Sequence, residues 1–144
     1  MPERANRTVL AFDFGLKRIG VAVGEPELRT AHPLPAIAAA GNARFAAIEK
    51  LVHEWKPARL VVGLPLSTQG SPHLMTRQAE RFAQRLQGRF RLPVARVDER
   101  YTSVEAESRL RGSRGKSGAK DGAKGAVDSV AAQLMLEQYF DELA

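Results

Sequence analysis

Apolar residues recur along the chain at two different spacings, and the first of these predicts strands. Residues 8–14 are apolar on both alternating faces except at Asp13, as expected of a central strand covered on both sides. Residues 15–18 form a short polar turn before a second apolar run, 19–23. So short a connection predicts an antiparallel hairpin. A third strand is expected around Pro35–Ala38.

The second spacing predicts two amphipathic helices in the middle of the chain. The first helix is expected to begin after Asn42, a good N-cap, and to end at Pro57. The second is expected to begin with Ser71 as N-cap and Pro72 in its first turn. Each helix buries one apolar stripe, made of Phe45, Ile48, Val52 and Trp55 in the first and of Met75, Ala79, Phe82 and Leu86 in the second.

Two more strands and a C-terminal helix complete the predicted domain. Short buried strands are expected at Leu60–Gly63 and Pro93–Asp98. A capping box predicts a short helix over residues 102–110. The last helix is expected from about Ala126 to Glu142, and it buries Val127, Val130, Ala131 and Leu134. This order predicts an α/β domain whose sheet combines an antiparallel meander with parallel crossovers.

Size and charge favour a single domain with a polyanionic partner. A chain of 144 residues has room for one hydrophobic core, so residues 1–144 are expected to form one domain. The 22 Lys and Arg residues exceed the 16 Asp and Glu residues and give a net charge of +6, which favours nucleic acid as the partner. Residues 111–125 are basic, rich in glycine and without a large apolar side chain. We expect them to form a flexible basic loop.

Composition also excludes several classes of site. The chain has no Cys, which rules out disulfides, thiolate zinc sites and a cysteine nucleophile. Its 3 His residues are scattered and lack the spacing of a metal cluster. No segment resembles a signal peptide or a membrane span, so the expected location is the cytoplasm, without a membrane partner.

Three acidic positions stand out against the predicted elements. Asp13 lies in a buried strand, where an ionised carboxylate costs several kcal/mol unless it is paired or bound to a cation. Asp98 and Glu99 close the strand that begins at Pro93, and Asp128 lies in the first turn of the last helix. Each has an ordinary structural explanation: a turn hydrogen bond, a surface acid pair, and an acid that complements the helix dipole.

Taken together, these acids suit metal-dependent phosphodiester hydrolysis. Carboxylates from a first strand, a later strand end and a terminal helix form the arrangement that holds two divalent ions about 3.5–4 Å apart over a phosphodiester. Mg²⁺ takes oxygen ligands, and neither His nor Cys is needed. In such a site one ion activates the attacking water while the other stabilises the leaving oxygen.

Four segments in this order resemble the YqgF/RuvX family of RNase H-like nucleases. They are residues 11–23, residues 61–66 with Gly70 after them, residues 97–106, and residues 128–132. The family is related to Holliday junction resolvases and is assigned to maturation of the 16S ribosomal RNA precursor. The resemblance covers nearly the whole chain and implies a metal-dependent endonuclease.

The resemblance also implies a fold and a set of ligands. The expected fold is a five-stranded mixed sheet of order 3-2-1-4-5, with strand 2 antiparallel and helices on its faces. Asp13, Asp128 and Glu99 are the expected catalytic residues and ligands of Mg²⁺ or Mn²⁺. Resolvases place an acid at the end of the fourth strand, where this chain has Gly63 and Leu64, so the third carboxylate must come from strand five. Asp98 remains an alternative to Glu99, because strand parity alone does not decide between them.

Basic residues near these acids are the expected contacts to nucleic acid. Such contacts position a phosphate backbone without reading its bases. Residues 67–69 are expected to line the same cleft. Structured RNA is the preferred substrate and branched DNA the alternative. The expected contacts are Lys17, Arg18, Arg100, Arg111, Arg114, Lys116, Lys120 and Lys124.

Two other functions are alternatives to the nuclease hypothesis. Asp-x-Gly before a hairpin also opens actin-like ATPases and sugar kinases, but these need two such domains to close around a nucleotide. A non-catalytic RNA-binding assembly factor would keep the fold without the chemistry. The sequence leaves open whether the chain is a monomer or a homodimer.

Overall fold

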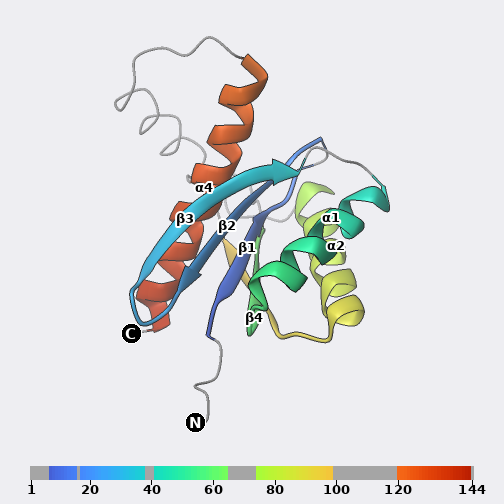
Figure 1. The fold of residues 1–144 in the computed structure, drawn as a ribbon. Coiled ribbons are helices and arrows are strands. Elements are labelled where there is room, and N and C mark those ends of the chain that lie inside the picture. The colour runs from blue at the N-terminus through green and yellow to red at the C-terminus, as the bar shows by residue number, and fades with distance from the viewer. Residues whose placement is uncertain (1–6, 16, 38–40, 65–73, 99–119, 144) are drawn as a thin grey trace.

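Five strands form one mixed sheet in the order β3-β2-β1-β4-β5 (Figure 1). The computed structural model describes residues 7–15, 17–37, 41–64, 74–98 and 120–143. The sheet pairs β1 antiparallel with β2 and β2 antiparallel with β3, whereas β1, β4 and β5 run parallel. The expected strand order and the antiparallel second strand are confirmed. The strands are β1 (Val9–Asp13), β2 (Ile19–Glu25), β3 (Thr30–Ile37), β4 (Arg59–Leu64) and β5 (Val94–Asp98).

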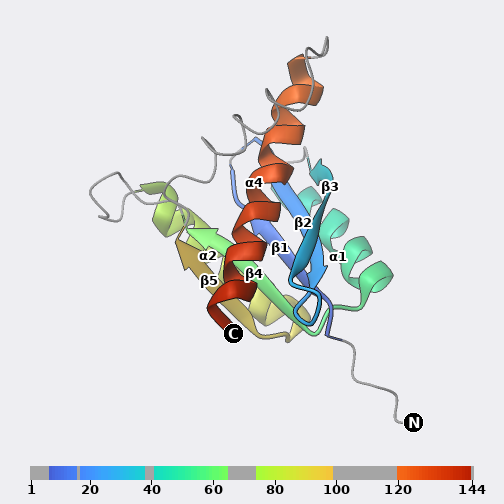
Figure 2. The same cartoon turned by 90° about the vertical axis from the view of Figure 1, so that its left-hand side faces the viewer.

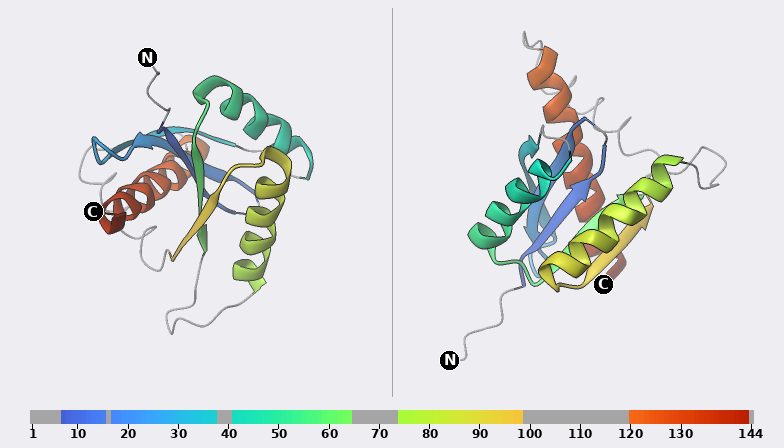
Figure 3. Two further views of the ribbon diagram at one scale, coloured as in Figure 1. Left: turned by 90° about the horizontal axis from the view of Figure 1, so that it is seen from below. Right: turned by 90° about the vertical axis from the view of Figure 1, so that its right-hand side faces the viewer.

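The described helices cover the sheet on both faces. These helices are α1 (Ala43–Trp55), α2 (Leu74–Phe90) and α4 (Lys120–Leu143). Figure 2 shows α4 lying across one face, and the right-hand view of Figure 3 shows α1 and α2 on the other. The fold therefore has three layers, and the central strands are covered on both sides.

Alternation along β1 assigns its side chains to these two layers. Leu10 and Phe12 belong to the hydrophobic core under α1 and α2. Val9 and Ala11 belong to a second core under α4. Because successive strand residues point to opposite faces, Asp13 falls on the α4 face of the sheet.

The third strand is longer than predicted and lies earlier in the chain. It begins at Thr30, directly after the turn in which the Arg29 amide donates to the Glu25 carbonyl. The prediction placed it around Pro35–Ala38, too late, because only the apolar end of this half-exposed strand resembles a buried one. β3 pairs with β2 alone, and two prolines are tolerated at such a sheet edge.

The predicted first helix is confirmed, and it begins directly after Asn42 as expected. Asn42 occupies the N-cap position, but its backbone is already helical and its side chain makes no capping hydrogen bond. The helix ends at Lys56, whose left-handed backbone lets its amide donate to the Val52 carbonyl. Pro57 follows directly. The predicted caps at Ser71 and Pro72 and the predicted helix over 102–110 lie outside the described residues.

The last helix starts earlier than predicted and buries a face that is shifted from the predicted one. It begins at Lys120, so residues 120–125 of the basic segment 111–125 are helical. Once a helix is anchored by packing, each added turn costs little, even in a polar sequence. Ala131 is buried as expected, but Val130 and Leu134 are only half-buried, because the stripe of α4 that faces the sheet is shifted round the helix. The side chain of Val127 lies outside those described. Its buried residues are Ser129, Ala131, Ala132, Met135, Leu136, Tyr139 and Phe140.

Candidate active site

The carboxyl ends of the three parallel strands meet at one edge of the sheet. Asp13 ends β1, and the strand register places it between Gly20 of β2 and Gly63 of β4. Gly63 in turn pairs with Val97 of β5. Ligands of open α/β sheets bind at this edge, because it combines strand ends with the beginnings of helices.

Asp13 has no side chain beside it on either neighbouring strand. Residues paired directly across strands share a face, and both partners of Asp13 are glycines. The Asp13 side chain is half-buried on the α4 face. The residues directly across from Asp13 on β2 and β4 therefore contribute only backbone at this position of the sheet.

Ser129 fixes α4 against this edge. Its hydroxyl accepts from the Val21 amide at 3.4 Å and donates to the Leu34 carbonyl at 2.6 Å. Val21 pairs with Phe12, the neighbour of Asp13 in β1. The backbone of Asp128, one residue before Ser129, is therefore held near the level at which β1 ends.

Helical spacing places position 128 on the sheet side of α4. Ala131, Ala132 and Met135 are fully buried against the sheet. Position 128 precedes them by one to two helical turns, on the same face. The side chain of Asp128 is not among those described.

Strand β5 separates the two acids that the sequence could not distinguish. Ala95 and Val97 pack in the core under α4, on the face that carries Asp13. Asp98 alternates to the other face and pairs with Leu64, which packs in the core under α1 and α2. Asp98 is exposed there, away from Asp13, and Glu99 lies outside the described residues.

An ion pair holds β5 to α2 on this second face. The Arg96 guanidinium donates to both carboxylate oxygens of Glu80, at 3.0 Å and 2.9 Å. These hydrogen bonds lower the pKa of Glu80 below its usual value, against a smaller opposing effect of burial. Glu80 is thus committed to a structural contact.

Only one of the three expected metal ligands has a described side chain, that of Asp13. Among residues 7–15, 17–37, 41–64, 74–98 and the described side chains of α4, no three His, Asp or Glu residues are grouped to hold a metal. The donor chemistry at Asp13 nevertheless suits a divalent cation, because a carboxylate is a ligand that Mg²⁺ prefers.

Several of the expected nucleic-acid contacts lie near the same edge. Lys17 is exposed and Arg18 half-buried in the turn that follows β1. Lys120 and Lys124 belong to the first turns of α4, which extend beyond the sheet (Figure 1). The others, together with residues 67–69, lie outside the described residues: Arg100, Arg111, Arg114 and Lys116.

Sequence reasoning overlooked the residues that shape this edge. Gly20 and Gly63 are unremarkable until the register places them beside Asp13. Ser129 follows an expected ligand directly, but its bonds reach residues 108 and 95 positions away, beyond any local pattern.

Comparison with known proteins agrees on one family. The family model described as "RuvX: Holliday junction resolvase" matches residues 7–142. A protein of Dechloromonas aromatica named "Putative pre-16S rRNA nuclease" is 58% identical, over 93% of this chain and 90% of its own length. A protein of the same name from Methylobacillus flagellatus is 53% identical, over 100% of this chain and 99% of its own.

A solved structure supports the fold. RuvC of T. thermophilus, in complex with a Holliday junction substrate, superposes with a TM-score of 0.54 over 95% of each chain at 13% identity. That likeness supports an RNase H-like fold.

None of the helices in the described part of the chain has the length and apolar character needed to cross a membrane.

Proposed function

This chain belongs to the RuvX family, and on that basis we propose that it is a metal-dependent endonuclease that matures the 5′ end of the 16S rRNA precursor. Its relatives of 58% and 53% identity carry the name of a pre-16S rRNA nuclease along nearly their full length. The proposal places the protein in the cytoplasm, where its substrate would be a structured RNA.

The observation that carries the proposal is the position of Asp13. It ends the central strand, lies on the α4 face, and has glycines on both sides. A carboxylate at the carboxyl end of a central strand, with glycines directly across from it on both neighbouring strands, is well suited to holding a cation against a phosphate.

We assign the metal ligands to Asp13, Asp128 and Glu99. Ser129 holds the backbone of residue 128 near the end of β1, on the sheet side of α4. Glu99 is chosen over Asp98 because Asp98 belongs to the face covered by α2. Three carboxylates from β1, the end of β5 and α4 supply the oxygen donors that a site for two Mg²⁺ or Mn²⁺ ions requires.

The bound ions would supply an activated water and charge stabilisation for phosphodiester hydrolysis. The chain's own task is then to position ions and substrate. Asp13 provides the ligand that the sheet holds most rigidly, since its strand is paired on both sides. Lys17 and Arg18 follow β1 and are placed to hold the phosphate backbone beside it.

Branched DNA is the second candidate substrate. The family model carries the description of a Holliday junction resolvase, and the RuvC structure of the same fold holds a junction. A metal site directed at the backbone can cut either nucleic acid, and the choice depends on contacts to the 2′-hydroxyl group. Cleavage of two strands in register would further require a symmetric dimer.

The test compares wild type with Asp13→Asn on end-labelled precursor RNA and on a four-way DNA junction, with Mg²⁺ or Mn²⁺. Asp98→Asn is the matched control, because it removes the same charge from the opposite face of the sheet. We expect metal-dependent cleavage of the RNA, reduced about 100-fold or more by Asp13→Asn and unchanged by Asp98→Asn. Equal cleavage by all three proteins would refute the assignment of Asp13. RNA binding by a wild type that cuts neither substrate would favour a non-catalytic assembly factor.

A further inference from the structure

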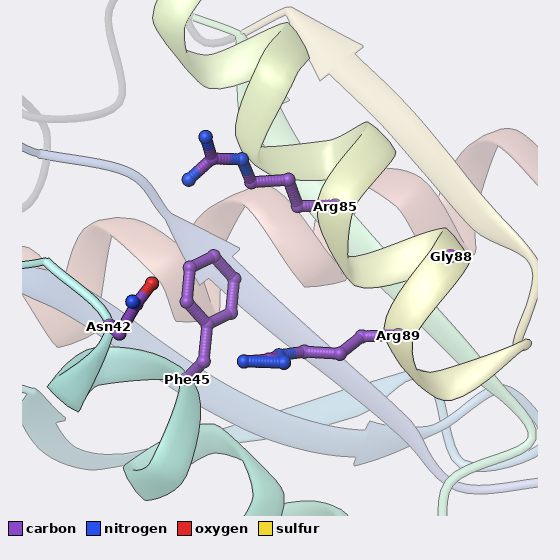
Figure 4. A pocket seen from close by; sticks show the side chains of 5 residues that line it. All are labelled: Asn42, Phe45, Arg85, Gly88 and Arg89. Carbon is purple, nitrogen blue, oxygen red and sulfur yellow. The ribbon is translucent and has the colours of Figure 1, made fainter.

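Helix α2 carries a row of arginines on the face of the fold opposite α4. Arg77, Arg81, Arg85 and Arg89 follow one another at intervals of four residues, which places them along one side of the helix. Arg81, Arg85 and Arg89 are exposed. In Figure 4 the side chains of Arg85 and Arg89 reach from α2 toward Phe45 of α1.

These arginines line two adjoining hollows between α1 and α2. One hollow, of about 160 Å³, is lined by Phe14, Arg44, Gln78, Arg81, Phe82 and Arg85. The other, of about 320 Å³, is lined by Asn42, Phe45, Arg85, Gly88 and Arg89. Because Arg85 borders both, they form one continuous surface, which we call the arginine groove.

Aromatic rings hold two of the guanidinium groups in place. The Arg44 guanidinium carbon lies 5.3 Å from the centres of the Phe14 and Phe45 rings and 5.4 Å from that of Phe82. The Arg89 guanidinium carbon lies 4.9 Å from the centre of Phe45. Cation–π contacts of this kind orient a guanidinium and leave its N–H groups available as donors.

Within the described part of the chain, no acid forms an ion pair with these arginines, although Glu49 borders a neighbouring hollow together with Arg89. Glu80, the one acid of α2, pairs with Arg96, and Glu49 of α1 lies 4.0 Å from His53. The pKa of Arg44 is lowered by burial and by the positive charge of Arg85. The cations therefore repel one another, and a bound anion would relieve that repulsion.

Two polar atoms in the groove lack hydrogen-bond partners. Nε of Arg44 and Oε1 of Gln78 are buried and make no hydrogen bond with the residues that the structure describes. A buried group without a partner costs about 1–3 kcal/mol, so both side chains would gain by turning toward a ligand that pairs with them. Nε needs an acceptor such as a phosphate oxygen. Oε1 needs a donor, which a ribose hydroxyl or a base amino group has and a fully ionised phosphate lacks.

One end of the arginine groove, which Phe14 lines, lies behind the candidate active site. Phe14 follows Asp13 directly and packs on the opposite face. α1 follows β3 and α2 follows β4, so both helices begin where the parallel strands end. Asn42 and Arg44 lie at the start of α1, so the positive end of this helix dipole adds to the charge of the groove.

We propose that the arginine groove binds the backbone of the nucleic acid substrate after it passes over the sheet edge from Asp13. This second contact rests on the proposed nuclease function and extends it to the other face of the domain. Guanidinium groups bind phosphates, and Gln78 accepts a hydrogen bond from the sugar or a base. The groove positions the substrate and takes no part in the chemistry.

The test compares Arg81→Gln/Arg85→Gln with Lys50→Gln/Arg91→Gln. Both double variants remove two exposed charges from the same face of the fold, but Lys50 and Arg91 do not line the groove. Anisotropy of a labelled precursor RNA fragment gives Kd in EDTA at several salt concentrations. We expect the groove variant alone to bind about 10-fold or more weakly. The slope of log K against log salt should be flatter by about 1.4 for two lost contacts to single-stranded RNA and by about 1.8 for two lost contacts to a duplex.

Equal losses in the two variants, or no loss in either, would overturn the proposal. A competition experiment distinguishes binding of nucleic acid from binding of any phosphate compound. An unlabelled RNA oligonucleotide should displace the probe at a phosphate concentration at which tripolyphosphate does not. Equal displacement by tripolyphosphate would make the groove a general anion site and refute the nucleic-acid assignment. Thermal melting of both variants confirms that the compared proteins are folded.

These outcomes are independent of catalysis, since EDTA removes the metal. A binding loss in the groove variant of a protein that proves unable to cut RNA would leave the groove standing and refute the proposed nuclease. Cleavage that depends on Asp13, together with unchanged binding by the groove variant, would refute the groove alone.

Discussion

Removal of the Ser129 hydroxyl tests how α4 is fixed to the sheet. This side chain is 3% exposed and lies where the pairing of β2 with β3 shifts register, between Ile19 and Val21. Its hydroxyl accepts from the Val21 amide and donates to the Leu34 carbonyl, so one side chain serves two strands. Ser129→Ala leaves the volume almost unchanged and deletes both bonds.

The expected cost follows from the two groups left without a partner. A buried polar group deprived of its hydrogen bond costs about 1–3 kcal/mol. The Val21 bond is long, at 3.4 Å, and contributes little, whereas the Leu34 bond, at 2.6 Å, contributes most. We therefore expect a loss of about 2 kcal/mol in the free energy of unfolding. With an unfolding entropy of about 2.1 cal/mol/K per residue, that loss lowers Tm by about 7 °C.

Urea unfolding and thermal melting of Ser129→Ala measure this cost, with Gln138→Ala as the control. Gln138 is exposed on the same helix and bonds only to Glu142 among the described residues, so its loss should cost less than about 0.5 kcal/mol. Hydrogen exchange of the Val21 amide should accelerate in the Ser129 variant. A change of stability as small as that of the control, with Val21 still protected, would show that Ser129 does not anchor α4.

Two further predictions concern the contacts of the two faces. The pKa of Glu80 is lowered in the folded state. Its ion pair therefore adds to the free energy of unfolding above the unfolded pKa of about 4.3, and this stabilisation is lost as the pH falls through the lower folded pKa. Urea unfolding should find wild type more stable than Glu80→Gln by up to about 1 kcal/mol at pH 7. The difference is small because the ion pair is partly exposed. A difference of the same size at pH 2 would contradict this linkage between stability and pH. Met135→Ala should lower the free energy of unfolding by about 2–5 kcal/mol, because this side chain is fully buried between α4 and the sheet. A loss under about 1 kcal/mol in the same assay would contradict its place in the core.

The local pattern of the sequence determined most of the elements. Apolar periodicity located α1, α2 and the strands β1, β2, β4 and β5, because each has one or two buried faces that the spacing of its side chains reveals. It also singled out Asp13 as a charge inside a buried strand, and the register confirms that this residue ends β1 at the carboxyl edge. The edge strand β3 was misplaced, because a half-exposed strand carries a weaker pattern.

Only the tertiary structure decided which face each residue occupies. Ala95, Val97 and Val94 are all apolar, so the sequence cannot say which of them faces α4 and thereby which neighbouring acid lies opposite Asp13. The same holds for the buried side of α4, which is set by packing on β2 and β3 and by the bonds of Ser129. The arginine groove depends on Arg44 of one helix and Arg85 of another, 41 positions apart in the chain. Contacts between distant segments depend on how the helices pack on the sheet, and the spacing of apolar residues within one segment does not predict that packing.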